Sequence, residues 1–273
     1  MTETLTLNEV AETLDVHYMT AYRYVRTGRL IATKEGGEWS VSAADLQQFV
    51  DGVQVQPRAD VLPTQLVDRL VAGDENGAFQ LLESAMASGA GHDEVYLDLF
   101  APAMAVIGQR WAEEDLTIAE EHVASAAALR VVARLGSRIA HRGRTRGTIL
   151  LATVVGDNHI LPTAIVRDLL RARGFAAVDL GANTPTDSIV EMSRVIGKDL
   201  LAIGLSATTS GSEDVVRNTI TKLLEHAAIP IVVGGGAFSS GDEIRALGDC
   251  YPSCSAREAL DIFETIHKTV RAG

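Results

Sequence analysis

The pattern of hydrophobic and polar residues changes twice along the chain. Apolar side chains recur every three to four positions over short runs in residues 1–52 and over long runs in residues 61–142. This spacing is typical of helices with one buried face. From residue 143 to residue 273, short aliphatic runs alternate with helical segments. We therefore expect three domains, with residues 53–60 as the linker that follows the first.

The first domain begins with two short predicted helices. Thr6 or Asn8 is placed to cap the first, which ends near Asp15, and an amphipathic run from His17 to Thr27 forms the second. Gly28 is placed to end that run in a left-handed conformation. Two short helices joined by so tight a turn predict a helix-turn-helix.

A hairpin and a third helix complete this domain. Residues 30–34 and 38–41 flank a Gly-Gly turn and predict the two strands of a wing. Ser42 then caps a helix from Ala43 to Val50, with Asp45 in the capping-box position. This order of elements resembles the short, excisionase-like branch of the MerR DNA-binding domains. The resemblance implies a winged helix-turn-helix that binds double-stranded operator DNA.

The winged helix-turn-helix assigns DNA contacts to individual residues. Thr20 and Arg23 would face the major groove from the second helix, while Arg26 and Lys34 of the wing would contact phosphates. A three-helix domain with a few arginines can instead be a protein-docking module. Positive charge gathered on one helix and one wing favours the DNA-binding interpretation.

Composition and charge narrow the class of protein. The chain has 273 residues, is 47% hydrophobic, and carries a formal charge of −12, which excludes wholesale disorder and a protein that coats nucleic acid by bulk charge. Residues 23–34 nevertheless hold four basic residues and no acidic one. The sequence shows no apolar run long enough for a membrane span and no signal pattern at its start, so we expect a cytoplasmic protein with no membrane partner.

Residues 61–142 predict a four-helix bundle. The helical segments are rich in Leu, Ala and Val, and they cover residues 63–72, 74–88, 92–113 and 116–140. Composition alone would favour a bundle that only holds subunits together.

Residues 143–273 predict a flavodoxin-like, doubly wound parallel sheet covered by helices on both faces. The expected strands are residues 148–154, 176–180, 200–206 and 229–233. Each is followed by a small or polar loop, and ligands of such sheets bind at these carboxyl ends. Cys250 and Cys254 are too few for a disulfide framework and are expected to be ordinary packed or surface thiols.

The loop after the first of these strands carries candidate chemistry. His159 can coordinate a metal through one ring nitrogen while Asp157 accepts a hydrogen bond from the other. Pro162 suits the first turn of the helix that follows. A single histidine in a loop is more often a structural residue, so this pair alone does not define a site.

Three motifs together resemble the cobalamin-binding domains of methionine synthase, corrinoid mutases and light-responsive regulators. They are Asp157-x-His159, Ser206-x-Thr208 and Gly234-Gly235, which occur in this order at successive strand ends. The resemblance implies that His159 is the lower axial ligand of cobalt. It also implies that the hydroxyl groups line a channel for the nucleotide tail, which the glycine backbone approaches closely. The preceding bundle is similar to the cap domain of that family.

The bundle carries a narrower resemblance. Trp111 is followed, after nine residues, by Glu121-His122, the pattern of the CarH-type regulators, which cap the upper face of adenosylcobalamin. The resemblance implies that Trp111 lies against the upper axial group and that Glu121 and His122 contact its adenosyl moiety. A tryptophan in such a bundle can also serve interhelical packing only.

Two positions depart from the family pattern. Pro162 stands where the motif has glycine, and Ala112 stands where some light-responsive members have a histidine that ligates cobalt after illumination. A proline at residue 162 could block the tail channel, which keeps haem or biliverdin open as alternative cofactors, since neither has a nucleotide tail.

The resulting hypothesis is a transcriptional regulator and not an enzyme. A light-sensitive tetrapyrrole, most simply adenosylcobalamin held between bundle and sheet, would control a homo-oligomer, dimer or tetramer, and thereby operator binding. The alternatives are a corrinoid methyl carrier and a cofactor-free interaction protein that has kept only the fold.

Overall fold

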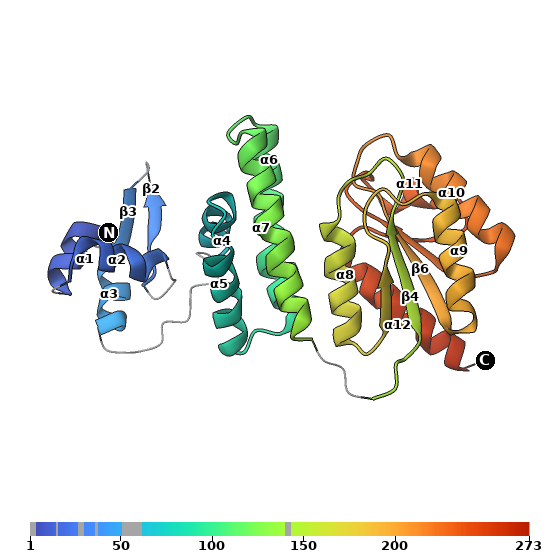
Figure 1. Ribbon diagram of the computed structural model, residues 1–273, viewed down its shortest axis with the longest axis horizontal. Coiled ribbons are helices and arrows are strands. Elements are labelled where there is room, and N and C mark those ends of the chain that lie inside the picture. Colours follow the sequence, from blue (N-terminus) through green and yellow to red (C-terminus); the bar gives the residue numbers. More distant parts are fainter. Residues whose placement is uncertain are drawn as a thin grey trace. The chain divides into compact units, whose positions relative to one another are not determined.

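The computed structural model describes residues 4–14, 16–26, 30–35, 38–50, 62–139 and 143–272. The chain divides into two compact units, Met1–Leu135 and Gly136–Gly273. Figure 1 shows the helix-turn-helix and bundle elements of the first unit and the sheet of the second. No described helix combines the length and the apolar character needed to cross a membrane.

The first unit begins with the predicted helix-turn-helix. Helix α1 (Leu7–Thr13) is capped by Thr6, whose backbone N–H donates to Glu9 Oε2 at 2.7 Å, and Glu9 N–H donates in turn to Thr6 Oγ1. Helix α2 (Tyr18–Arg26) follows. The expected break at Asp15 and the expected cap at Gly28 lie outside the described residues.

The wing is a three-stranded antiparallel sheet in the order β1-β3-β2. Strands β2 (Thr33–Glu35) and β3 (Glu38–Ser42) form the predicted hairpin, and α3 (Ala43–Val50) follows as predicted, with Asp45 N–H donating to Ser42 Oγ at 3.1 Å. Strand β1 (Thr4–Thr6) was not expected. Three residues are too short a run to show a period, and β1 exists because it pairs with β3.

Four helical segments form the bundle that was predicted for residues 61–142, of which the structure describes residues 62–139. They are α4 (Leu62–Val71), α5 (Glu75–Ala87), α6 (Ala101–Ala112), which continues the π-helical segment η1 (Glu94–Phe100), and α7 (Ile118–Ser137). The third segment was expected to be one regular helix. Pro102 lacks an N–H and crowds the carbonyl one turn earlier, which accounts for the wider turns directly before it.

The second unit holds a parallel sheet in the order β5-β4-β6-β7-β8, the flavodoxin-like order that the sequence predicted. Its strands are β4 (Thr148–Thr153), β5 (Ala176–Asp179), β6 (Leu200–Ser206), β7 (Ile231–Gly234) and β8 (Tyr251–Ser253). Strand β8 was not expected, because three residues that include Pro252 give no strand signal.

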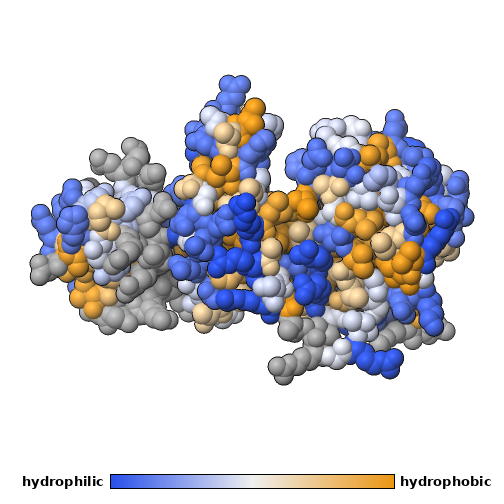
Figure 2. Space-filling model, in the orientation of Figure 1, coloured by the Kyte–Doolittle hydropathy of each residue, from blue (hydrophilic) through white to orange (hydrophobic). Residues whose placement is uncertain are grey.

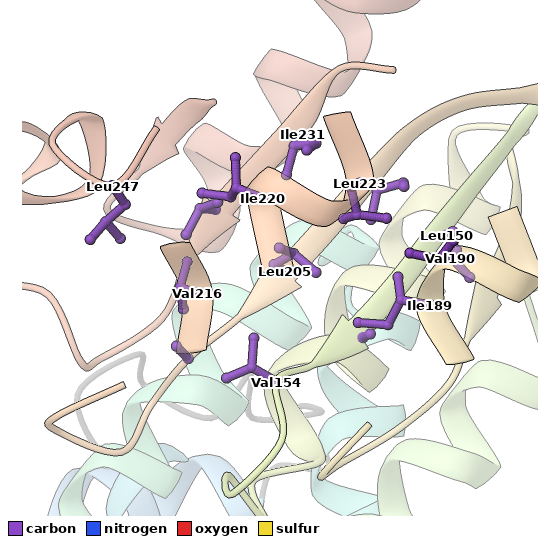
Figure 3. Close-up of a cluster of buried hydrophobic side chains, with 14 of the residues drawn as sticks. Leu150, Val154, Ile189, Val190, Leu205, Val216, Ile220, Leu223, Ile231 and Leu247 are labelled. Carbon is purple, nitrogen blue, oxygen red and sulfur yellow. The ribbon is translucent and has the colours of Figure 1, made fainter. Parts of the chain in front are cut away.

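Helices cover both faces of this sheet (Figure 1). Helices α8 (Leu161–Ala172) and α12 (Ala256–Ala272) pack together on one face, and α9 (Thr186–Ile196) and α10 (Glu213–His226) pack on the other. Figure 3 shows the core under α9 and α10, where Ile189 and Ile220 meet Leu205 of β6. A shorter helix, α11 (Gly241–Arg245), precedes β8. The carboxyl ends of β4, β5 and β6 are thereby fixed side by side.

Candidate functional site

The buried carboxylate of Asp157 organises the loop that follows β4. Its side chain is 0% exposed, and its Oδ1 accepts from the backbone N–H of His159 at 3.0 Å and lies 2.6 Å from His159 Nδ1. Its Oδ2 accepts from the backbone N–H groups of Thr208 and Thr209, the latter at 3.2 Å. Asp157 thus joins the loop after β4 to the loop after β6.

These bonds fix the histidine ring for one kind of contact. With Nδ1 of His159 held by Asp157, the other ring nitrogen, Nε2, is left for a ligand, and the side chain is 56% exposed. A carboxylate on the far nitrogen orients an imidazole and raises its basicity toward a metal. The structure therefore brings Asp157 and His159 together in the geometry that the sequence predicted.

Asp157 remains a carboxylate in this setting. Burial by itself raises its pKa, but hydrogen bonds from Thr208, His159 and Thr209 together lower the pKa below its ordinary value. A charged Asp157 can only accept hydrogen bonds, so Nδ1 of His159 carries the proton.

Two further residues hold this loop, and sequence reasoning missed both. The hydroxyl of Thr153, at the end of β4, donates to the carbonyl oxygen of His159 at 3.0 Å. Asn183, in the loop after β5, accepts from Gly156 N–H through Oδ1 at 2.7 Å. Nothing in the sequence pattern marks them, because a threonine inside an apolar strand and an asparagine in a loop are both common.

The hydroxyl groups of Ser206 and Thr208 are buried. Both lie at the carboxyl end of β6, and Ser206 Oγ and Thr208 Oγ1 are buried without a hydrogen-bond partner among the described residues. A buried hydroxyl without a partner costs free energy, so two of them together indicate a site for a polar group that arrives with a ligand.

The glycines after β7 make room for this loop. Gly235 has φ of +122°, and a Cβ there would overlap the backbone of Ala207, between the two hydroxyl-bearing residues. A Cβ on Gly234 would lie 2.9 Å from the carbonyl oxygen of Ser253. Both positions thus require the absence of a side chain because of packing within the protein, and the approach of their backbone to a nucleotide tail stays a prediction.

Pro162 causes no disruption of the loop. It lies in the first turn of α8, half-buried, where a missing N–H has no cost. No group of three or more His, Cys, Asp or Glu side chains in the described ranges is gathered as a metal site requires. A single histidine suits a metal that arrives with most of its ligands already in place.

In the first unit, the predicted bundle residues lie on α6 and α7. Trp111 is 49% exposed in the last turn of α6. Glu121, in the first turn of α7, accepts from Ser125 Oγ at 2.5 Å, and the His122 side chain is 74% exposed, with its Nε2 3.7 Å from Glu121. All three residues are accessible to a ligand.

Three large apolar side chains are exposed on α6 and α7, the helices that carry Trp111, Glu121 and His122. Figure 2 shows apolar surface along α6 and the start of α7. Val106 and Ile118 are 42% and 64% exposed there, and Val123 is 46% exposed. Single exposed apolar side chains are normal on a protein surface, so these three residues do not by themselves define a binding surface.

The predicted DNA-contacting residues lie on α2 and the wing. Thr20 is half-buried on α2. Arg23 and Arg26 belong to the same helix and Lys34 to β2, but their side chains lie outside the described part of the structure. Their DNA contacts therefore stay predictions.

Comparison with protein families matches each part of the chain. A helix-turn-helix domain family matches residues 4–53, and two families, each described as a B12 binding domain, match residues 62–135 and 147–262. The chain is therefore a helix-turn-helix protein that carries a B12-binding module made of a helical part and a sheet part.

Curated relatives place it more closely. It is 26% identical over 223 residues to the HTH-type transcriptional repressor CarH of Myxococcus xanthus, covering 76% of this chain and 72% of CarH. It is also 26% identical over 193 residues to a corrinoid protein of Desulfitobacterium hafniense, covering 67% of this chain and 88% of that protein. With its helix-turn-helix domain, the chain is a CarH-like cobalamin-binding regulator.

The solved structure of the Methanosarcina barkeri monomethylamine corrinoid protein has the same fold. It aligns with a TM-score of 0.62 at 20% identity and covers 72% of this chain and 94% of that one. At this identity the likeness concerns the fold alone.

Proposed function

We propose that this chain is a DNA-binding transcriptional regulator that binds adenosylcobalamin, with His159 as the lower axial ligand of cobalt. The observation that carries the proposal is the Asp157 carboxylate, which is buried, holds His159 Nδ1 at 2.6 Å and leaves Nε2 for a metal. The matches to two B12 binding domain families agree with this assignment.

Cobalamin suits the site better than haem or biliverdin does. Ser206 and Thr208 offer buried hydroxyl groups with no described partner. A nucleotide tail uses such groups, whereas haem and biliverdin have no tail. Pro162, the residue that kept the alternatives open, occupies an ordinary helical turn.

The residues of the bundle are assigned to the upper axial group. Trp111 offers a half-exposed apolar ring, and Glu121 and His122 offer accessible polar groups. When bound, adenosylcobalamin supplies a cobalt–carbon bond that light cleaves. Trp111 would contact the upper axial group only while that group is bound, so the contacts of the bundle would differ between the dark and illuminated forms, as a two-state switch requires.

The affinity for DNA would depend on the oligomeric state of the protein. The whole chain carries a charge of −12, and its acid-free basic stretch, Arg23 to Lys34, holds four basic residues. One such domain offers few phosphate contacts, so useful affinity needs several domains on one DNA molecule. Arg23 and Thr20 would contact bases, and Arg26 and Lys34 would contact phosphates.

The experiment compares the holoprotein in darkness and after green illumination. We expect the dark and illuminated forms to differ in mass by light scattering and in affinity for an operator duplex. The same mass and the same affinity in both states would refute light control. His159→Ala should change the visible spectrum of the holoprotein, and His226→Ala, on α10, is the matched control.

A second candidate is a corrinoid methyl carrier, which the likeness to corrinoid proteins favours. The helix-turn-helix match to residues 4–53 opposes it, since a methyl carrier needs no DNA-binding domain. Binding of a defined duplex with a steep salt dependence would decide for the regulator, because phosphate contacts release counterions. Reconstitution in parallel with haem and biliverdin tests the other cofactors and the cofactor-free alternative by colour.

A further inference from the structure

Asn183 adopts an unusual backbone conformation beside the His159 loop. Its φ is +50°, and Glu114 is the only other residue besides glycine with positive φ in the described ranges. Asparagine tolerates this left-handed region better than most residues do. The conformation lies at the carboxyl end of β5, directly beside the loop that follows β4.

From this position Asn183 holds the turn that precedes His159 at two points. Its backbone N–H donates to the carbonyl oxygen of Asp157 at 2.8 Å, and its Oδ1 accepts from the backbone N–H of Gly156 at 2.7 Å. The neighbouring backbone is tied as well, because Thr184 N–H donates to Thr153 O at 3.0 Å. The turn is thus fastened to the end of β5.

Asp157 is consequently held from both sides of β4. Thr208 and Thr209 bind its carboxylate from the β6 side, and Asn183 binds its backbone from the β5 side. The carboxylate in turn holds the ring of His159 at 2.6 Å. A loop held from one side only could rotate about its ends and would carry the ring with it.

We infer that Asn183 is a positioning residue, which sets the direction in which His159 presents Nε2 to a bound cobalt. The inference rests on the proposed function for the identity of that metal. Asparagine and aspartate alone combine a short side-chain acceptor with tolerance for positive φ. The side chain of Asn183 is exposed, so its replacement leaves the core unchanged.

Three variants separate the acceptor from the backbone conformation. Asn183→Asp keeps both, Asn183→Gly keeps only the freedom to adopt positive φ, and Asn183→Ala keeps neither. In the full-length chain without cofactor, we expect Gly156 N–H to exchange with solvent about tenfold faster in the Gly and Ala variants, and within about twofold of wild type in the Asp variant. If conformation alone mattered, the Gly variant would behave like wild type, and the inference would be wrong.

The second measurement uses adenosylcobalamin in darkness. We expect the Asn183→Gly protein to release it about tenfold faster than wild type, with an altered visible spectrum, and the Asn183→Asp protein to match wild type. If wild type retains the cofactor and the Gly variant retains it equally, the inference fails and the proposed function stands. If wild type binds no cobalamin, the proposed function fails, and the exchange of Gly156 still decides whether Asn183 holds the loop.

Discussion

Nδ1 of His159 lies 2.6 Å from Oδ1 of Asp157, a carboxylate with no exposed surface that also accepts two backbone N–H groups from the loop after β6. The ring is therefore held by a group that belongs to the protein core. The orientation of the ring depends on hydrogen bonds that join the loop after β4 to the loop after β6.

Replacing Asp157 with Asn should weaken cobalamin binding about 10- to 100-fold, as loss of such a partner does at other metal sites. The amide has the shape of the carboxylate, but an NH₂ group replaces one of the two oxygens and cannot accept a hydrogen bond. The variant therefore loses the bonds either from His159 or from the backbone N–H groups of Thr208 and Thr209. Titration of the apoprotein with adenosylcobalamin in darkness, followed by absorption, measures the change.

Asp187→Asn is the matched control for this substitution. Asp187 lies on α9 with its side chain 87% exposed, paired with Lys222 at 3.1 Å. We expect this variant to bind cobalamin as wild type does. Equal losses in both variants would show that removal of a charge, and not the orientation of His159, caused the effect.

Gly235→Ala should destabilise the second unit by about 2 kcal/mol or more and abolish cofactor retention, because the added methyl group overlaps backbone at Ala207. Gly197 separates this overlap from backbone strain. It also has positive φ, +63°, but a Cβ there meets no atom within 4 Å. Urea unfolding of both variants should show a clearly smaller loss for Gly197→Ala, and similar losses would contradict the steric explanation.

Glu264→Gln should make the free energy of unfolding depend less on pH. Two bonds of 2.7 Å to the Arg146 guanidinium lower the pKa of Glu264. A carboxyl group whose pKa is lowered by folding stabilises the fold at pH values above its pKa in the unfolded chain, which is about 4.3 for glutamate. This stabilisation is lost as the pH falls through the pKa of the group in the folded protein. We expect a loss of about 1–2 kcal/mol at pH 7 that shrinks below about pH 4.

Urea unfolding at several pH values measures this difference, with Asp242→Asn as the control. The Asp242 side chain is 92% exposed in its ion pair with Arg245, so its contribution should be near zero at every pH. A constant difference between wild type and Glu264→Gln from pH 7 to pH 3 would refute the assigned role of the charge.

Arg23→Ala tests the proposed DNA-binding surface. We expect a loss of about 1–3 kcal/mol in binding to a duplex that the wild-type protein selects from a random pool, and relaxed preference at one base position. Arg194→Ala, on α9 in the second unit, removes the same charge and should leave binding unchanged. Fluorescence anisotropy at two salt concentrations compares them, and equal affinities for wild type and Arg23→Ala would remove this residue from the interface.

The elements with a strong pattern were predicted well from the sequence. Strand β6 and helix α3 have the predicted bounds, because an aliphatic run and a capping serine define them locally. Strands β1 and β8 were missed, because each has three residues and forms only by pairing with a longer strand. Pairing across the sheet leaves no periodic trace in so short a segment.

The candidate site was predictable only in part. Asp157 and His159 are two residues apart, so their contact could be expected from spacing. The part of Thr208 that binds Asp157 is its backbone N–H, which every residue except proline has. Asn183 comes from the loop after the next strand along the chain, and its role depends on a backbone angle that the sequence does not reveal.

The half-exposed ring of Trp111 has a practical consequence. The chain has two tryptophans, Trp39 on β3 of the wing and Trp111 on α6, and residues 136–273 contain none. Tryptophan emission therefore reports on the first unit alone, whereas tyrosine emission also comes from Tyr251 of β8. With Trp39 replaced by Phe, the emission of a single indole would follow the occupancy of the bundle surface without any attached dye.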